Sequence, residues 1–218
     1  DEYHSMGYLN ESIINTLARL GWSGGENEVF TLNELIKDFD ISEVQKAGAI
    51  FDITKLDWIN SQHLNNLSKE SFKTHIMPFI DNLGIDYSQY QQLDELIEAM
   101  RSVKPNLQLI AQALIPYLDT FKEYDEKGVS KFLIGSEETL ILVIESLQTI
   151  KSWSEVEIDS MLVKIQEKLG LKTPQMNQPI RIALTGSTQS PSLGLTIKLM
   201  GRNKSIELLN KALKFITK

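Results

Sequence analysis

The stretch "SEETLILVIESLQTI", residues 136 to 150, is the most apolar helical pattern in the chain. Ser136 is a residue type that commonly begins a helix, and Glu137 and Glu138 interact favourably with the positive end of a helix dipole. The apolar side chains that follow are too many for one narrow face, which is typical of a buried helix. We therefore predict a central helix here and a mainly α protein built around it.

Amphipathic patterns of helical period cover most of the remaining sequence, separated by capping residues and glycines. Thr31 with Glu34, and Ser154 with Glu157, each have the spacing of a capping box at a helix start. No repeat of fixed period and no low-complexity linker occurs in the sequence. The pattern predicts several packed layers of helices, with soft boundaries near Ser68 and near residues 120 to 130.

The composition excludes several classes of protein. The chain has 218 residues, 42% of them hydrophobic, and no cysteine. This excludes a disulfide framework, a zinc site built on thiolates and a cysteine nucleophile. No apolar run approaches the roughly 18 residues of a membrane span, and the polar start "DEYHSMGYLNES" is unlike a signal peptide. We expect a cytoplasmic protein that does not enter a membrane.

Charge is unevenly distributed along the chain. From Leu162 to the end there are ten Lys and Arg but only two acids, whereas the net charge of the whole chain is −7. A basic end on an acidic protein is typical of a surface that binds a polyanion such as nucleic acid. The alternative is a solvated helical surface whose lysines only keep the protein soluble.

Motifs of self-contained catalysis are missing. "GWSGG" lacks the spacing of a dinucleotide or P-loop motif, and there is no Gly-x-Ser-x-Gly elbow. His4, His63 and His75 lie in different segments and form no ligand pair, and His63 fits the packed face of a helix. We predict no catalytic residue, no metal-ligating residue and no cofactor within this chain.

The stretch "PIRIALTGSTQSP", residues 179 to 191, differs from the helical patterns around it. Ile180, Ile182 and Leu184 alternate as in a half-buried strand, so we predict one short extended segment near 179–185. A turn rich in hydroxyl groups follows, and Pro191 is expected to open the next helix. Taken alone, the stretch also fits an edge strand with an exposed Arg181 and an ordinary helix cap.

Three stretches together resemble a known family. They are "MGYLNESIINTLARLGWSGGENEVFTLNELIKDFD" at 6–40, "KAGAIFDITKLDWINSQHL" at 46–64 and "QPIRIALTGSTQSPSLGLTIKLMGRNKSIELLNKAL" at 178–213. In order and spacing they are similar to the bacterial-type glutamyl-tRNA synthetases, over the part that follows the catalytic domain. The match extends over nearly the whole chain and is more specific than any single motif.

The resemblance implies the domain layout and which part of the full-length ligase performs the catalysis. It implies a stem-contact domain at 1–68 and two helical anticodon-binding domains at 69–125 and 126–218. The family's ATP-binding motifs lie upstream, so ATP and Mg²⁺ would serve the full-length ligase while this chain alone would be inactive. The implied partners are glutamate tRNA and the N-terminal catalytic domain of the same polypeptide, in a monomer.

The resemblance also implies the RNA-binding residues. In this family the element that matches residues 179–191 faces the anticodon loop. The planar fork of Arg181 suits base edges and phosphates, and hydroxyl groups in the turn suit splayed-out bases. The anticodon set is Arg181, Thr185, Ser187, Ser190, Pro191 and Leu193, where Leu193 matches a position that packs on a base. The expected contacts to the tRNA backbone are Lys198, Arg202, Lys204 and Lys211.

One departure from the family concerns specificity. Some members carry an Arg in the first helical anticodon domain that helps to reject glutamine tRNA. In "MRSVKPNLQL" that position falls on Val103, with Arg101 and Lys104 close by, and all three join the candidate anticodon contacts. We therefore expect an enzyme that also accepts glutamine tRNA. The competing hypothesis is a helical protein-interaction module without an RNA role, whose acidic portion binds a basic partner.

Overall fold

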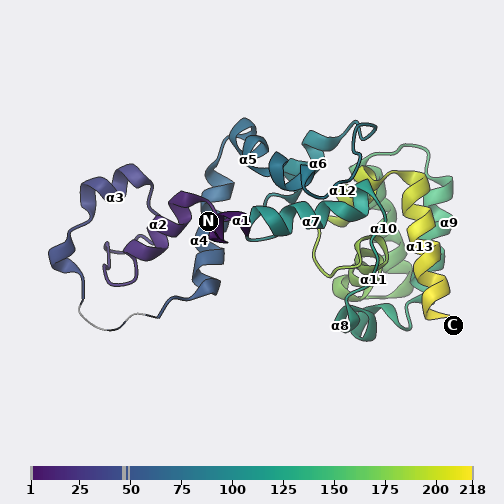
Figure 1. Ribbon diagram of the computed structural model, residues 1–218. Coiled ribbons are helices and arrows are strands. Elements are labelled where there is room, and N and C mark those ends of the chain that lie inside the picture. Colours follow the sequence, from purple (N-terminus) through teal and green to yellow (C-terminus); the bar gives the residue numbers. More distant parts are fainter. Residues whose placement is uncertain (1, 46–47, 49, 218) are drawn as a thin grey trace. The chain divides into compact units, whose positions relative to one another are not determined.

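The computed structural model, shown in Figure 1, describes residues 2–45, 48 and 50–217. Helices supply all the regular secondary structure within those ranges, which confirms the prediction of a mainly α protein. In chain order the elements are α1 (Glu2–Ser5), α2 (Asn10–Ala18), α3 (Leu32–Asp38), η1 (Ile41–Glu43), α4 (Ile53–Asn66), α5 (Lys69–Asp81), α6 (Leu93–Met100), α7 (Leu107–Leu118), α8 (Glu126–Gly128), η2 (Val129–Leu133), α9 (Glu137–Thr149), α10 (Glu155–Leu169), α11 (Thr173–Thr185), α12 (Leu193–Met200) and α13 (Arg202–Ile216).

The chain divides into two compact units. Unit 1 comprises Asp1–Ile85 with Ile97–Gln112, and unit 2 comprises Asp86–Leu96 with Ala113–Lys218. The division falls inside α6 and α7, so each of these helices belongs partly to both units. The predicted layout of 1–68, 69–125 and 126–218 describes family domains rather than compactness, and it stays a prediction.

Helix α9 is central to unit 2, as its sequence predicts. Leu140, Val143, Ile144 and Leu147 are buried. The helix packs against both α13 and α10, and Figure 1 shows α9 and α13 side by side. The buried residues form one broad face that packs on both neighbours, whereas Ile141, on the other side of the helix, is 42% exposed.

The extended segment predicted near 179–185 is wrong, because these residues form the second half of α11. The alternation of Ile180, Ile182 and Leu184 misled because α11 contacts η2, α13, α9 and α12 and is buried on opposite sides. A short apolar run of this kind cannot be assigned by periodicity alone. Met176, Ile180 and Ala183, spaced i, i+4 and i+7, form one buried helical face within it.

Two predicted helix starts have the expected side-chain cap, although only the first is a complete capping box. Thr31 and Glu34 form the expected capping box of α3, and the Ser154 side chain accepts a hydrogen bond from the Glu157 backbone. The prediction for Pro191 is wrong, because α12 begins at Leu193 and its N-cap is Ser192. Proline is favoured in the first turn of a helix, but the hydroxyl of Ser192 accepts a hydrogen bond from a backbone N–H of that turn. Ser192 therefore takes the N-cap position and the helix begins after it.

Two buried asparagines hold unit 1 together. The Asn60 side chain accepts from the backbone N–H of Leu9 at 2.9 Å and donates to the carbonyl of Pro105 at 2.6 Å. Asn15 Oδ1 accepts from the Phe30 backbone at 2.8 Å and lies 3.1 Å from His63 Nε2. Since unpaired polar groups are costly to bury, these bonds fix the register of segments far apart in the sequence.

The buried imidazole of His63 is expected to make unit 1 acid-sensitive. Burial lowers the pKa of His63 below its usual 6.5, although the nearby Glu11 carboxylate opposes that shift. The unfolded chain therefore takes up a proton that the folded state refuses. Stability should be constant well above pH 6.5 and fall as the pH drops below it, by at most about 1.4 kcal/mol per pH unit. Urea unfolding of the protein and of His63→Gln between pH 5 and 7.5 measures this; equal slopes for both would contradict it.

Candidate nucleic-acid interface

The turn from Thr185 to Ser192, which follows α11, has a fixed backbone. Gly186 has a φ of 71°, and its carbonyl accepts a hydrogen bond of 2.7 Å from the Asp125 backbone. A Cβ at this position would lie 2.8 Å from the Glu123 carbonyl oxygen and 2.8 Å from the Phe121 ring. Only glycine fits both the left-handed conformation and this close approach. The turn is therefore ordered by the protein before any ligand binds.

Arg181 lies beneath the turn and is half-buried. Its Nε donates to Ser190 Oγ at 2.8 Å, and one of its Nη atoms lies 3.5 Å from the Pro191 carbonyl. Thr196 donates to the same Ser190 hydroxyl at 3.0 Å and accepts from the Tyr117 hydroxyl at 3.3 Å. Burial lowers the pKa of Arg181, yet an arginine stays charged at neutral pH. A permanent cation is thus held in place next to the turn.

The hydroxyl groups of the turn serve partly to shape it. Thr185 Oγ1 donates to the Arg181 carbonyl at 2.8 Å and accepts from the Ser187 backbone at 3.2 Å. Ser187 Oγ in turn accepts from the Gln189 backbone at 3.2 Å. Gln189 and Ser192 are exposed and Ser187 and Ser190 are partly exposed, so one side of the turn is open to solvent.

Five of the predicted anticodon residues on this segment lie together, whereas Leu193 is buried. Arg181, Thr185, Ser187, Ser190 and Pro191 share one hydrogen-bonded turn. Leu193 is buried, with 4% of its surface exposed, so it offers little area to a base in this conformation.

Three of the four cations expected on the tRNA backbone instead make contacts within unit 2. Lys198 Nζ lies 2.6 Å from Glu95 Oε1. Arg202 donates to the Ile150 carbonyl at 2.6 Å, at the end of α9, and its guanidinium lies 5.1 Å from the Trp153 ring centre. These contacts stabilise unit 2 and leave the two side chains less available to phosphate.

Lys204 has a similar internal role. Its Nζ donates to the carbonyls of Tyr117 at 3.0 Å and Asp119 at 2.9 Å, at the end of α7, and burial lowers the pKa of Lys204. Cations commonly satisfy the free carbonyls at helix C-termini in this way. Lys211 differs, because it is exposed and lies 5.3 Å from the Phe121 ring centre.

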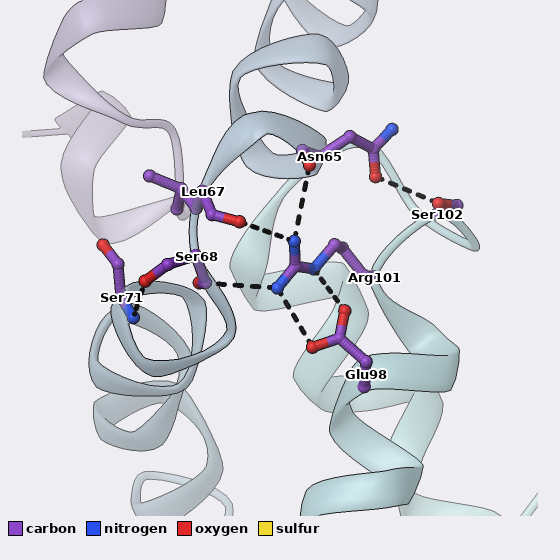
Figure 2. Close-up of polar contacts among 7 residues, drawn as sticks. All are labelled: Asn65, Leu67, Ser68, Ser71, Glu98, Arg101 and Ser102. Atoms are coloured by element: carbon purple, nitrogen blue, oxygen red, sulfur yellow. Dashed lines mark hydrogen bonds and ion pairs between the residues drawn. The ribbon is translucent and has the colours of Figure 1, made fainter.

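Arg101 belongs to unit 1, where its side chain is buried and its guanidinium bonds neighbouring groups (Figure 2). Its guanidinium pairs with the Glu98 carboxylate at 2.9 and 3.1 Å and donates to the Leu67 carbonyl at 2.8 Å. It also lies 4.5 Å from the Phe72 ring centre. The structure favours a role in packing over the predicted base contact. Val103 and Lys104, also in unit 1, are partly exposed.

Several residues of the interface were missed from the sequence. Gly186, Tyr117 and Thr196 shape the turn but were not predicted as site residues. A glycine directly after a helical pattern is a recognised helix-stop signal, so Gly186 could have been found. Tyr117 and Thr196 are far from the turn in sequence, and nothing local indicates their contact.

Other kinds of site are not evident in the part of the chain that the structure describes. Within residues 2–45, 48 and 50–217, no group of three or more His, Cys, Asp or Glu side chains gathers as metal ligands would. None of the described helices is both long and apolar enough to cross a membrane.

Comparison with known families gives the class of protein. Residues 62–213 match the family model described as an anticodon binding domain, and the chain belongs to this family. Residues 1–58 match the model for the catalytic domain of class I tRNA synthetases of the E and Q type. These matches support recognition of tRNA over the competing protein-interaction module.

Among solved structures, the chain is similar to two glutamate–tRNA ligases. The chain is 25% identical to a glutamate tRNA ligase from Elizabethkingia meningosepticum CCUG26117, with a TM-score of 0.76 over 98% of this chain and 43% of that one. For the glutamate-tRNA synthetase from Elizabethkingia anophelis the identity is 25% and the TM-score 0.74, over 97% and 42% of the two chains. The chain thus spans less than half the length of these relatives.

Proposed function

We propose that this chain is the tRNA-recognition part of a glutamate–tRNA ligase. The observation that carries the proposal is the ordered turn at 185–192, with Arg181 fixed beneath it, inside the anticodon-binding match. The ligase would join glutamate to tRNA using ATP and Mg²⁺, with that chemistry performed by an N-terminal catalytic domain. The 218-residue chain would by itself be inactive and would act in the cytoplasm as part of a monomer.

The turn suits unpaired bases in three ways. It offers hydroxyl groups and backbone N–H groups on an open side, which can bond the edges of bases that are splayed out of a stack. Arg181 adds a planar set of donors that can bond a base edge in two places. Because the turn is already ordered, binding loses little conformational entropy at this point.

We also propose relaxed specificity toward glutamine tRNA. Val103 stands where some relatives are expected to carry a discriminating arginine, and a valine cannot donate a hydrogen bond to an anticodon base. The neighbouring Arg101 offers no substitute, because its donors are bound to Glu98 and to backbone carbonyls. The chain should therefore bind glutamate and glutamine tRNA with affinities that agree within about threefold, a difference of less than 1 kcal/mol.

Titration with glutamate tRNA, glutamine tRNA and a glutamate tRNA with a mutated anticodon tests both proposals, and an affinity for glutamine tRNA far below that for glutamate tRNA would contradict relaxed specificity. We expect the chain to prefer glutamate tRNA over a copy with a mutated anticodon, and Arg181→Ala to lower that discrimination by about 1–3 kcal/mol. Fluorescence anisotropy at two salt concentrations measures the affinities. Lys211→Ala is the matched control. The loss of a phosphate contact should lower the affinity for both tRNAs equally and lower the salt dependence of binding. Normal discrimination by the Arg181→Ala protein would remove that residue from the interface.

A further inference from the structure

The basic C-terminal part has a second open surface, which we call the α9–α10 groove. It is a hollow of about 420 Å³ between the last half of α9 and α10, and Lys151, Lys164 and Lys168 stand along it. All three lysines are exposed. None of them makes an ion pair within the described residues, unlike Lys198. Their charges are therefore available to a ligand.

Helix geometry explains why these side chains line one groove. On α10, Met161, Lys164 and Lys168 are separated by three and four residues, so they form a single stripe. On α9, Leu142, Ser146 and Thr149 have the same spacing and form the opposite wall. Glu157 is the one carboxylate among the lining residues, which leaves the groove with a net positive charge.

The groove and the turn described above both border the first turn of α10. The Ser192 hydroxyl, at the end of the turn, donates to Glu155 Oε1 at 2.7 Å, in the first turn of α10. The groove begins beside the same turn of α10, at Glu157, and continues along the helix toward Lys168. Glu155 and Glu157 are two residues apart and lie on nearly opposite sides of α10, so a polyanion that reaches both the turn and the groove would pass around the start of this helix.

We propose that the α9–α10 groove binds the sugar–phosphate backbone of the same tRNA whose anticodon meets the turn. Lysines are mobile point charges that suit phosphates without reading sequence, and hydroxyl groups such as that of Ser146 can add bonds to phosphate oxygens. Lys164 and Lys168 thereby take over the role for which the sequence suggested Arg202 and Lys204. This inference rests on the proposed function, because it assumes that the anticodon arm lies at the turn.

The test is a salt titration of the whole chain with glutamate tRNA and with the anticodon-mutated copy. For Lys164→Gln/Lys168→Gln we expect roughly tenfold weaker binding near 0.1 M salt and a salt slope lower by roughly 1.4–1.8. The preference for the correct anticodon should not change, because backbone contacts do not read bases. Lys164→Arg/Lys168→Arg should keep the affinity of the unchanged protein.

Lys131→Gln/Lys214→Gln is the matched control, since it removes two exposed positive charges of unit 2 that do not line the groove. Affinity and salt slope unchanged in the groove variant, or lowered equally in the control, would overturn the inference and leave the anticodon site standing. If the unchanged chain showed no anticodon preference at all, the proposed function would fail as well, and a basic groove for an acidic protein would be the better reading.

Discussion

Gly7→Ala is expected to lower the free energy of unfolding of unit 1 by roughly 3–4 kcal/mol. Gly7 has a φ of 86°, a conformation that side chains other than glycine rarely adopt. A Cβ there would also lie 2.5 Å from the backbone nitrogen of Gln108 and 2.7 Å from that of Leu107. Both neighbours are backbone atoms at the start of α7, so neither can move aside as a flexible side chain would.

The close approach has a structural purpose. The Gly7 carbonyl accepts a hydrogen bond of 3.0 Å from the Leu107 N–H, and the Asn106 side chain accepts one of 2.9 Å from the Leu109 N–H. Together they satisfy donors of the first turn of α7, which have no partner within the helix. Displacement of Gly7 would therefore damage both the N-terminal segment and the start of α7.

Urea unfolding followed by tryptophan fluorescence measures the effect, since Trp22 and Trp58 lie in unit 1. Gly25→Ala is the matched control. Gly25 also has a positive φ, 74°, but nothing lies within 4 Å of its missing Cβ. The control should lose only about 1–2 kcal/mol from backbone strain. Equal losses for the two variants would show that the contact with α7 is unimportant.

Arg101→Ala is expected to cost roughly 2–4 kcal/mol in the stability of unit 1. The variant would leave the Glu98 carboxylate without its ion pair and would remove the donor from the Leu67 carbonyl (Figure 2). The Glu98 side chain is 32% exposed, so water can replace part of the lost interaction. The expected loss of unfolding free energy is therefore smaller than for breaking a fully buried ion pair.

Two further variants separate the causes. Arg101→Lys keeps the charge but cannot bond the carboxylate and the carbonyl together, so an intermediate loss is expected. In a double-mutant cycle with Glu98→Ala, the two single losses should sum to more than the loss in the double variant. Additive losses would mean that the ion pair contributes nothing by itself. The stabilisation by Arg101 would then come from its hydrogen bond to the Leu67 carbonyl and from packing on Phe72.

The sequence predicted the helices and their buried faces, but not the surroundings of each charged side chain. Leu140, Val143 and Leu147 are buried in a central helix as predicted, because helical period and apolarity are local properties. The same local reasoning failed at Ile180, Ile182 and Leu184. Alternation indicates a strand only when one face is solvated, and α11 has partners on opposite sides.

The cations show the same limit. Arg181 was correctly placed beside a hydroxyl-rich turn, because the turn follows it directly in sequence. Arg202 and Lys204 were expected on phosphates, but they bond the carbonyls at the ends of α9 and α7. The number of positive charges can be counted in the sequence, whereas which of them already make hydrogen bonds within the protein depends on helix ends that only the fold brings near.

The sequence alone therefore determined the helical class, the caps of α3 and α10, the family and the turn that carries the proposed RNA contacts. These follow from residue types and spacings within one or a few helical turns. The tertiary structure decided that Arg101 stabilises unit 1, that Gly7 supports α7, and that Lys164 and Lys168 remain open to solvent. Each of those outcomes depends on the packing between segments that are far apart in sequence. No local sequence pattern predicts that packing.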